Sequence, residues 1–298
     1  MANPLAGVFP AVWTPTDCVG NLLVPELRAN LTFLKRHGVN GFMALGSTGE
    51  FPLLELVTRK QLLEEVIAAA GSLPVLANIS DARHWIVADL GRFARQIGAR
   101  AVAVLPPYFY HVAQCDLVEF FLRAADASEL PLVLYNFPER TGIRIELETI
   151  AAVAERIPLA AVKQSGNDFA YHTALVGLGQ EKRFVVFTGA DTRFGEALEL
   201  GAAGTISGIA NAVPELLVQI FTGDMADAAE EARLASKRLE MIEPILNTLW
   251  FPLNIAALMA ARGLRTGEPK EVVSAVSHQR YLEVMGDFER LFREWKLA

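Results

Sequence analysis

Short runs of apolar residues recur along most of the chain, and longer stretches with a helical spacing of apolar positions separate them. A short apolar run bounded by turn residues is typical of a buried strand. We predict eight such strands, at Gly7–Trp13, Gly41–Leu45, Pro74–Asn78, Ala101–Leu105, Pro131–Asn136, Leu159–Lys163, Phe184–Gly189 and Ala203–Gly208.

Helices are predicted between these strands. In residues 24–38, Leu27, Leu31 and Leu34 fall on one helical face, and the pattern stops at Gly38. Residues 88–99 repeat this arrangement and stop at Gly98. A glycine directly after a helical pattern is a common C-terminal signal. Beyond Val213 the pattern is helical to the end, most clearly in residues 225–242 and 277–295.

The alternation of strands and helices predicts the α/β class with a parallel sheet. Eight strands at this spacing favour a closed (β/α)8 barrel of the TIM type. The rival architecture is an open doubly wound sheet, but the glycine-rich turn that would follow its first strand is absent. We therefore predict a catalytic barrel over residues 1–225, with residues 226–298 as a C-terminal helical extension of the same domain.

Composition narrows the function classes. The 298 residues are 52% hydrophobic and carry a net charge of −7, without a Lys/Arg-dense patch, so nucleic acid is not an expected partner. Neither a membrane-spanning run nor a signal-peptide pattern is present, and two cysteines fit a reducing cytoplasm, so we expect a cytoplasmic protein without a membrane partner. Metal-ligand and nucleotide-binding motifs are absent, so no cofactor is predicted.

The most informative single residue is Lys163, which ends the predicted sixth strand. A lone lysine at such a place is usually a side chain whose stem lies on apolar surface and whose ammonium reaches water. The alternative is an amine held in a pocket, where it can attack a carbonyl. Barrel enzymes carry their catalytic groups at the C-terminal ends of the strands, so the neighbouring strand ends decide between the two.

Those neighbouring strand ends carry a coherent set of groups. Tyr135 ends the fifth strand and can move a proton for an imine-forming lysine. The turn "GSTG" after the second strand offers the hydroxyls of Ser47 and Thr48 and converging backbone N–H groups to a carboxylate. Arg140, in the loop after strand five, can bind a second carboxylate, although pairing with Glu139 is its ordinary alternative. Together they favour Schiff-base chemistry on a 2-oxo acid.

Four segments, "GSTGEFPLL", "YNFPERTG", "AAVKQSGND" and "GADTRFGEALELGAAGTISGIANAVPE", resemble the dihydrodipicolinate synthase / N-acetylneuraminate lyase family of class I pyruvate-type aldolases. The resemblance spans roughly residues 7–267. It implies a barrel enzyme, usually a homotetramer, that needs neither metal nor nucleotide. It also implies that Lys163 forms the Schiff base, that Tyr135 relays protons with Thr48, that Ser47 and Thr48 bind the carboxylate of pyruvate, and that the backbone of Ile206 lines the pyruvate pocket.

The chain departs from the synthase pattern at two places. Where the synthases carry two tyrosines, it has Tyr108 and Phe109, and a phenylalanine cannot pass a proton, which leaves Tyr110 as a candidate replacement. The synthases' lysine-feedback pocket is also unmatched, with Phe51, Leu56 and Arg59 in that region.

Three functions remain open from the sequence. The first is a lyase acting on pyruvate or a carboxylated 2-oxo acid, such as a 2-keto-3-deoxy sugar acid or 4-hydroxy-2-oxoglutarate. The second is 4-hydroxy-tetrahydrodipicolinate synthase, which condenses pyruvate with aspartate semialdehyde. The third is a barrel that binds a small acid without catalysis, which the presence of both Lys163 and Tyr135 disfavours.

Overall fold

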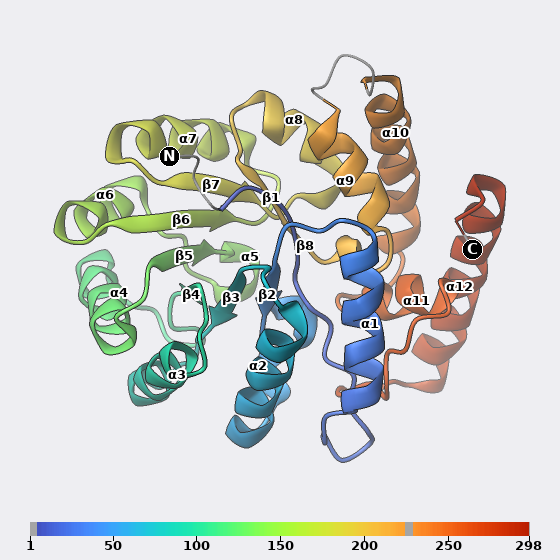
Figure 1. Ribbon diagram of the computed structural model, residues 1–298, viewed down its shortest axis with the longest axis horizontal. Helices are drawn as coiled ribbons and strands as arrows, with labels where there is room; N and C mark the ends of the chain where they lie inside the picture. Colours follow the sequence, from blue (N-terminus) through green and yellow to red (C-terminus); the bar gives the residue numbers. More distant parts are fainter. Residues whose placement is uncertain (1–4, 224–228, 298) are drawn as a thin grey trace.

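A computed structural model describes residues 5–223 and 229–297 and confirms the predicted barrel (Figure 1). Eight parallel strands form one sheet in the order β1-β8-β7-β6-β5-β4-β3-β2. Their bounds are β1 Gly7–Pro10, β2 Phe42–Ala44, β3 Val75–Asn78, β4 Ala101–Val104, β5 Leu132–Asn136, β6 Leu159–Gln164, β7 Val185–Thr188 and β8 Gly204–Ser207.

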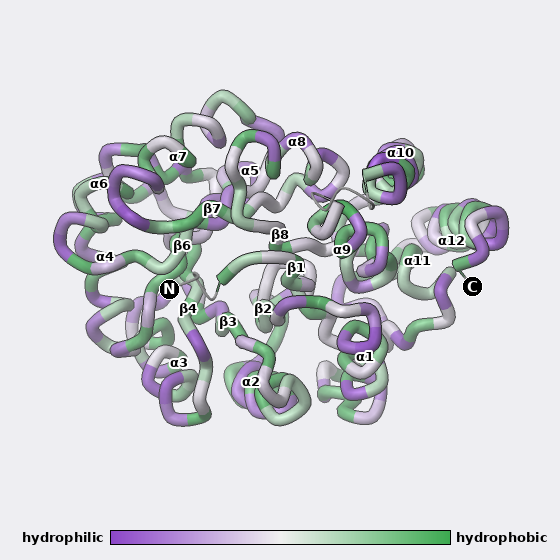
Figure 2. The backbone as a smooth tube through the Cα atoms, turned by 45° about the horizontal axis from the view of Figure 1, so that its top comes forward, coloured by the Kyte–Doolittle hydropathy of each residue, from purple (hydrophilic) through white to green (hydrophobic). Residues whose placement is uncertain are grey.

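Helices follow the strands around the outside of the barrel (Figure 1). They are α1 Val24–Arg36, α2 Leu56–Ala70, α3 His84–Gln96, α4 Gln114–Ser128, α5 Pro138–Thr141, α6 Leu147–Arg156, α7 Phe169–Lys182, α8 Phe194–Glu199, α9 Pro214–Thr222, α10 Ala229–Leu246, α11 Leu253–Ala261 and α12 Ala275–Trp295. The predicted helix stops are confirmed, since Gly38 and Gly98 follow α1 and α3 with positive φ angles of 77° and 90°. Along the tube the strands are largely apolar, whereas the helices alternate polar and apolar positions (Figure 2).

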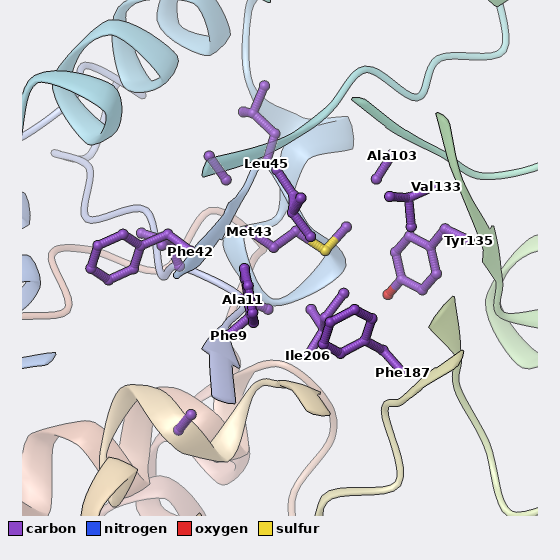
Figure 3. Close-up of a cluster of buried hydrophobic side chains, with 14 of the residues drawn as sticks. Phe9, Ala11, Phe42, Met43, Leu45, Ala103, Val133, Tyr135, Phe187 and Ile206 are labelled. Atoms are coloured by element: carbon purple, nitrogen blue, oxygen red, sulfur yellow. The ribbon is translucent and has the colours of Figure 1, made fainter. Parts of the chain in front are cut away.

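Alternate strand residues fill the barrel interior. Phe9, Met43, Tyr135, Phe187 and Ile206 converge there from five different strands (Figure 3). All five are buried, because a parallel barrel strand is covered by helices on one face and by the other strands on the other. The interior is therefore a packed core, and polar chemistry is restricted to the ends of the strands.

The strands β1 and β2 meet at the seam of the barrel. β1 is shorter than predicted: its ladder ends at Pro10, and beyond it Ala11 forms only an isolated bridge to Met43. One further bond, from the Val12 N–H to the Met43 carbonyl at 2.9 Å, continues this contact. The Asn40 N–H also donates to the Val8 carbonyl at 2.9 Å, so backbone bonds join the two strands on both sides of Phe9.

The C-terminal helices pack beside the barrel, with α10 against α9 and α11 against α12 (Figure 1). The boundary that the sequence suggests between residues 225 and 226 lies outside the described residues. Residues 264–270, here called the C-terminal strap, run between α11 and α12 and bond back to the start of the chain. The Glu268 N–H donates to the Thr16 carbonyl at 2.7 Å, and the Trp13 indole donates to the Thr266 carbonyl at 2.8 Å. These bonds support our proposal that the extension belongs to the barrel domain.

Candidate active site

Lys163 lies inside the protein, at the C-terminal end of β6. Its backbone is in register with Tyr135 on β5 and with Phe187 on β7, and both of those rings point into the barrel (Figure 3). Its side chain is only 4% exposed, and the amine lies 4.2 Å from the centre of the Tyr135 ring. The space above it depends on Gly189, where a Cβ atom would lie 3.2 Å from the lysine Cε. Lys163 is therefore not a surface lysine with its ammonium in water.

Tyr135 connects this lysine to the turn after β2. Its ring is buried, and its hydroxyl lies 3.3 Å from the Ser47 Oγ, with either oxygen able to donate. In Figure 3 the hydroxyl end of Tyr135 points toward the side of the barrel that carries Ile206 and Phe187. One hydrogen bond thus connects the Ser47–Gly49 turn to the tyrosine whose ring lies beside the lysine.

The turn that carries Ser47 and Thr48 is a single turn of 3-10 helix, Ser47–Gly49, directly after β2. Gly49 is required there, because a Cβ atom would lie 2.7 Å from the Val12 carbonyl oxygen. Thr48 is buried, and its hydroxyl is close enough to Gly208 that a Cβ atom on that glycine would lie 2.9 Å from it. The second and eighth strands therefore deliver their ends to the same place.

Ile206 lies on β8 in register with Phe9, and its side chain is buried in the barrel interior (Figure 3). The structure thus brings the end of β8 to the site. The role predicted for the Ile206 backbone stays a prediction.

Arg140 lies on α5, a short helix where the sequence predicted a loop. Its guanidinium carbon is 5.9 Å from the centre of the Phe137 ring and 4.9 Å from that of the Phe251 ring. It forms no ion pair with Glu139 or with any other carboxylate in the described part of the chain. Arg140 and Ser47 both line a cavity of about 550 Å³, which Lys163 and Tyr135 do not line. The arginine is therefore at the outer end of the site and the lysine at its inner end.

One polar residue of this site escaped the sequence analysis. Asp191, two residues beyond Gly189, accepts a bond at 3.0 Å from the Ile209 N–H through Oδ2, while its Oδ1 is buried without a hydrogen-bond partner among the described residues. Burial raises the pKa of Asp191 from 3.8 to about 6, against the lowering effects of the Ile209 N–H, the Ser207 hydroxyl and the Lys163 charge. The sequence feature that could have identified Asp191 is its position just after the end of a predicted strand, in "GAD".

The loop after β4 carries the residues at which the chain departs from the synthase pattern. Tyr108 packs edge-on against Phe51, with ring centres 6.2 Å apart. Phe109 is 85% exposed and Tyr110 is 75% exposed, and the two rings contact each other. Within one chain, Tyr110 therefore lies on the surface and does not stand beside Tyr135.

The structure shows what surrounds Arg59 in the region where the sequence departs from the synthases' feedback pocket. Arg59 is buried and bonds to the Asp81 carboxylate at 3.0 Å and to the Phe51 carbonyl at 2.9 Å. Leu56 begins α2 beside it. Two of the three guanidinium nitrogens, Nε and Nη1, thus bond to the protein's own groups.

A buried lysine at the end of β6, a tyrosine in register beside it and a hydroxyl-bearing turn define the class of protein: a (β/α)8-barrel lyase of the Schiff-base type. The chain belongs to the dihydrodipicolinate synthetase family, which matches residues 4–291. Members of this family are lyases and aldolases that form a lysine Schiff base with pyruvate. The predicted family, fold and general enzyme class are confirmed.

Among curated relatives, 4-hydroxy-tetrahydrodipicolinate synthase of Methanothrix thermoacetophila is 31% identical over 248 residues, which are 83% of each chain. An uncharacterized DapA-like lyase of Halobacterium salinarum is 30% identical, over 88% of this chain and 86% of the relative. Among solved structures, the prophage protein YagE of E. coli K12, in complex with pyruvate, is 26% identical with a TM-score of 0.89, covering 96% of this chain and 98% of YagE.

The described residues contain no group of three or more His, Cys, Asp or Glu side chains arranged to hold a metal ion. Of the helices within residues 5–223 and 229–297, none combines the length and apolar character needed to cross a bilayer.

Proposed function

We propose that Lys163 forms a Schiff base with the carbonyl of pyruvate or a larger 2-oxo acid, and that the enzyme makes or breaks a bond at the adjacent carbons. The observation that carries the proposal is the buried Lys163 amine beside Tyr135, whose hydroxyl is linked to Ser47. The amine adds to the carbonyl and water leaves, which gives an imine. The protonated imine then accepts the electron pair released when a proton or a carbon–carbon bond is lost next to it.

Tyr135 is proposed as the acid and base of these steps, because its hydroxyl can exchange a proton with Ser47 and its ring lies beside the lysine amine. The Ser47–Gly49 turn is proposed as the anchor for the substrate carboxylate, with Thr48 assisting the proton relay. The backbone of Ile206 would close the pyruvate end of the pocket.

Arg140 is proposed as the clamp for a second carboxylate or a polar tail. Its forked donors have no carboxylate partner among the described residues, and it shares a cavity with Ser47. This favours a carboxylated 2-oxo acid, such as a 2-keto-3-deoxy sugar acid or 4-hydroxy-2-oxoglutarate.

The second candidate is 4-hydroxy-tetrahydrodipicolinate synthase. It is favoured by Arg140, which can hold the carboxylate of aspartate semialdehyde, and by the name of the Methanothrix relative. It is disfavoured by Phe109, which stands where the synthases resembled by this chain carry a relay tyrosine. A barrel that binds a small acid without catalysis is the third candidate, and the retained Lys163 and Tyr135 oppose it.

Reduction with borohydride in the presence of pyruvate, followed by mass spectrometry of the peptide that contains Lys163, tests the shared chemistry. A reduced adduct on Lys163 is expected. A folded protein that binds pyruvate without any adduct would favour the binding-protein candidate. If the adduct forms, two activities are then compared: turnover of pyruvate with aspartate semialdehyde, and cleavage of carboxylated 2-oxo sugar acids. The faster reaction separates the first two candidates.

We also propose a homotetramer in the cytoplasm. The exposed aromatic rings of Phe109 and Tyr110 support a subunit contact, because exposed apolar side chains that adjoin one another are typical of interfaces. The unpaired Cys18 and Cys115 fit a reducing compartment. Light scattering on the purified protein gives the subunit number directly.

A further inference from the structure

A second buried lysine lies near the site, on the C-terminal strap. The Lys270 amine is 2.6 Å from the Glu50 Oε2 and 2.7 Å from the Thr14 carbonyl oxygen, and 5.1 Å from the centre of the Trp13 ring. The two charged side chains are only 4% and 7% exposed. This pair is thus shielded from water, and its amine is bonded on two sides.

Stability alone is a weak reason for such a pair. Removing two charges from water costs free energy that their attraction does not reliably repay, and apolar replacements are often equally stable. Burial lowers the pKa of Lys270, with the Glu50 charge and hydrogen bond acting in the opposite direction. The position of Glu50, directly after the Ser47–Gly49 turn, indicates that the ion pair fixes the shape of that turn.

Glu50 is the residue that ends the Ser47–Gly49 turn. Its backbone N–H donates to the Ser47 carbonyl at 3.1 Å, and its φ and ψ angles are 56° and 38°, in the left-handed region. A residue with a Cβ atom is disfavoured there and stays only where its surroundings hold it. The Glu50 side chain is held by Lys270, so the ion pair bears directly on the shape of the turn.

Lys270 is itself on a fixed support. Gly267, three residues earlier, forms a bridge with Thr16, and its φ angle is +69°. A Cβ atom at Gly267 would lie 2.4 Å from the Thr16 carbonyl oxygen, so the strap follows the N-terminal segment closely. The Lys270 amine is therefore carried by a segment that is itself bonded to the N-terminal segment at Thr16.

We infer that Lys270 and Glu50 are positioning residues, which hold the Ser47–Gly49 turn in the shape that binds the carboxylate of a 2-oxo acid. The inference rests on the function proposed for that turn. It makes the affinity for every 2-oxo acid depend on a lysine of the C-terminal extension that touches no substrate.

The test is the pyruvate dependence of borohydride trapping at Lys163. In Lys270→Met, the half-saturating pyruvate concentration is expected to rise about 10-fold to 100-fold, which is the range caused by small misplacements of binding groups. The trapping rate at saturating pyruvate is expected to change far less, because the amine that forms the adduct lies on β6 and not on the turn. Lys270→Arg, which keeps the charge, should restore part of the affinity.

Glu50→Gln keeps the shape of the side chain and is measured in parallel, so the result does not depend on Lys270→Met folding. The control is Arg280→Ala, which removes an exposed ion pair with Glu283 on the same extension and should leave half-saturation unchanged. Unchanged half-saturation in folded Glu50→Gln or Lys270→Met, with the wild type forming its adduct, would overturn this inference alone. Absence of an adduct in the wild type would overturn the proposed function and this inference with it.

Discussion

The buried carboxyl of Asp191 gives a quantitative expectation for stability against pH. Burial raises its pKa to about 6, from 3.8, so the folded protein holds this proton more tightly than the unfolded chain does. Stability is therefore lost as the pH rises through this window, and the loss is complete above about pH 6. At about 1.4 kcal/mol for each pKa unit, the ionised carboxylate destabilises the fold by about 3 kcal/mol at neutral pH.

Asp191→Asn removes the titrating group while its amide oxygen can still accept from the Ile209 N–H. The free energy of unfolding, measured in urea for the variant and the wild type, is compared at pH 7.5 and pH 4.5. Any change that does not depend on pH, such as a lost contact, cancels between the two conditions. Linkage predicts that the variant gains about 2 kcal/mol relative to the wild type between the lower and the higher pH.

Asp126→Asn, at an exposed aspartate of α4, is the matched control and should show the same stability difference from the wild type at both pH values. If Asp191→Asn also gave a difference independent of pH, the buried carboxyl would not be titrating as its surroundings indicate. A variant that loses stability as the pH rises, relative to the wild type, would reverse the sign and refute the reasoning outright.

Three further substitutions probe the site and its support. Tyr135→Phe should lower kcat by about 10²-fold to 10⁴-fold, the usual contribution of a positioned proton donor, and retention of wild-type kcat would remove the relay role. Arg140→Ala should raise KM for the physiological substrate by about 10-fold to 100-fold, which is the contribution of a hydrogen bond to a charged group. The pyruvate concentration that half-saturates trapping should stay constant. An unchanged KM would exclude the role of Arg140 as a clamp. Arg59→Leu leaves Asp81 buried with only the partner Arg83 and should cost about 3 kcal/mol in urea unfolding, whereas a loss below about 1 kcal/mol would show that Arg83 suffices.

The barrel could be predicted from the sequence because its strands are continuous apolar runs and its helices end at glycines such as Gly38 and Gly98. Each of these signals is local, and the strand count then restricts the topology to a few choices. Lys163 and Tyr135 could be proposed as site residues in the same way, since strand ends can be located in sequence and active sites of barrels lie there.

Asp191 and Lys270 could not be predicted in this manner. An aspartate after a strand is common in turns, and only the three-dimensional structure shows that its Oδ1 is buried without a partner in the described chain. Lys270 lies in a polar loop far from any predicted strand, and its partner Glu50 is 220 residues away. Long-range pairs of this kind leave no periodic pattern in a single sequence.

That separation has a consequence for how the protein is made. A ribosome adds about 5–20 residues per second, so Glu50 is synthesised about 10–40 s before Lys270, its ion-pair partner. All eight strands, ending at Ser207, precede the strap in the order of synthesis. All the strands of the barrel are therefore synthesised before the residue that pairs with Glu50 at the end of the Ser47–Gly49 turn. If the inference above holds, the proposed binding site is complete only after the chain has grown past Lys270.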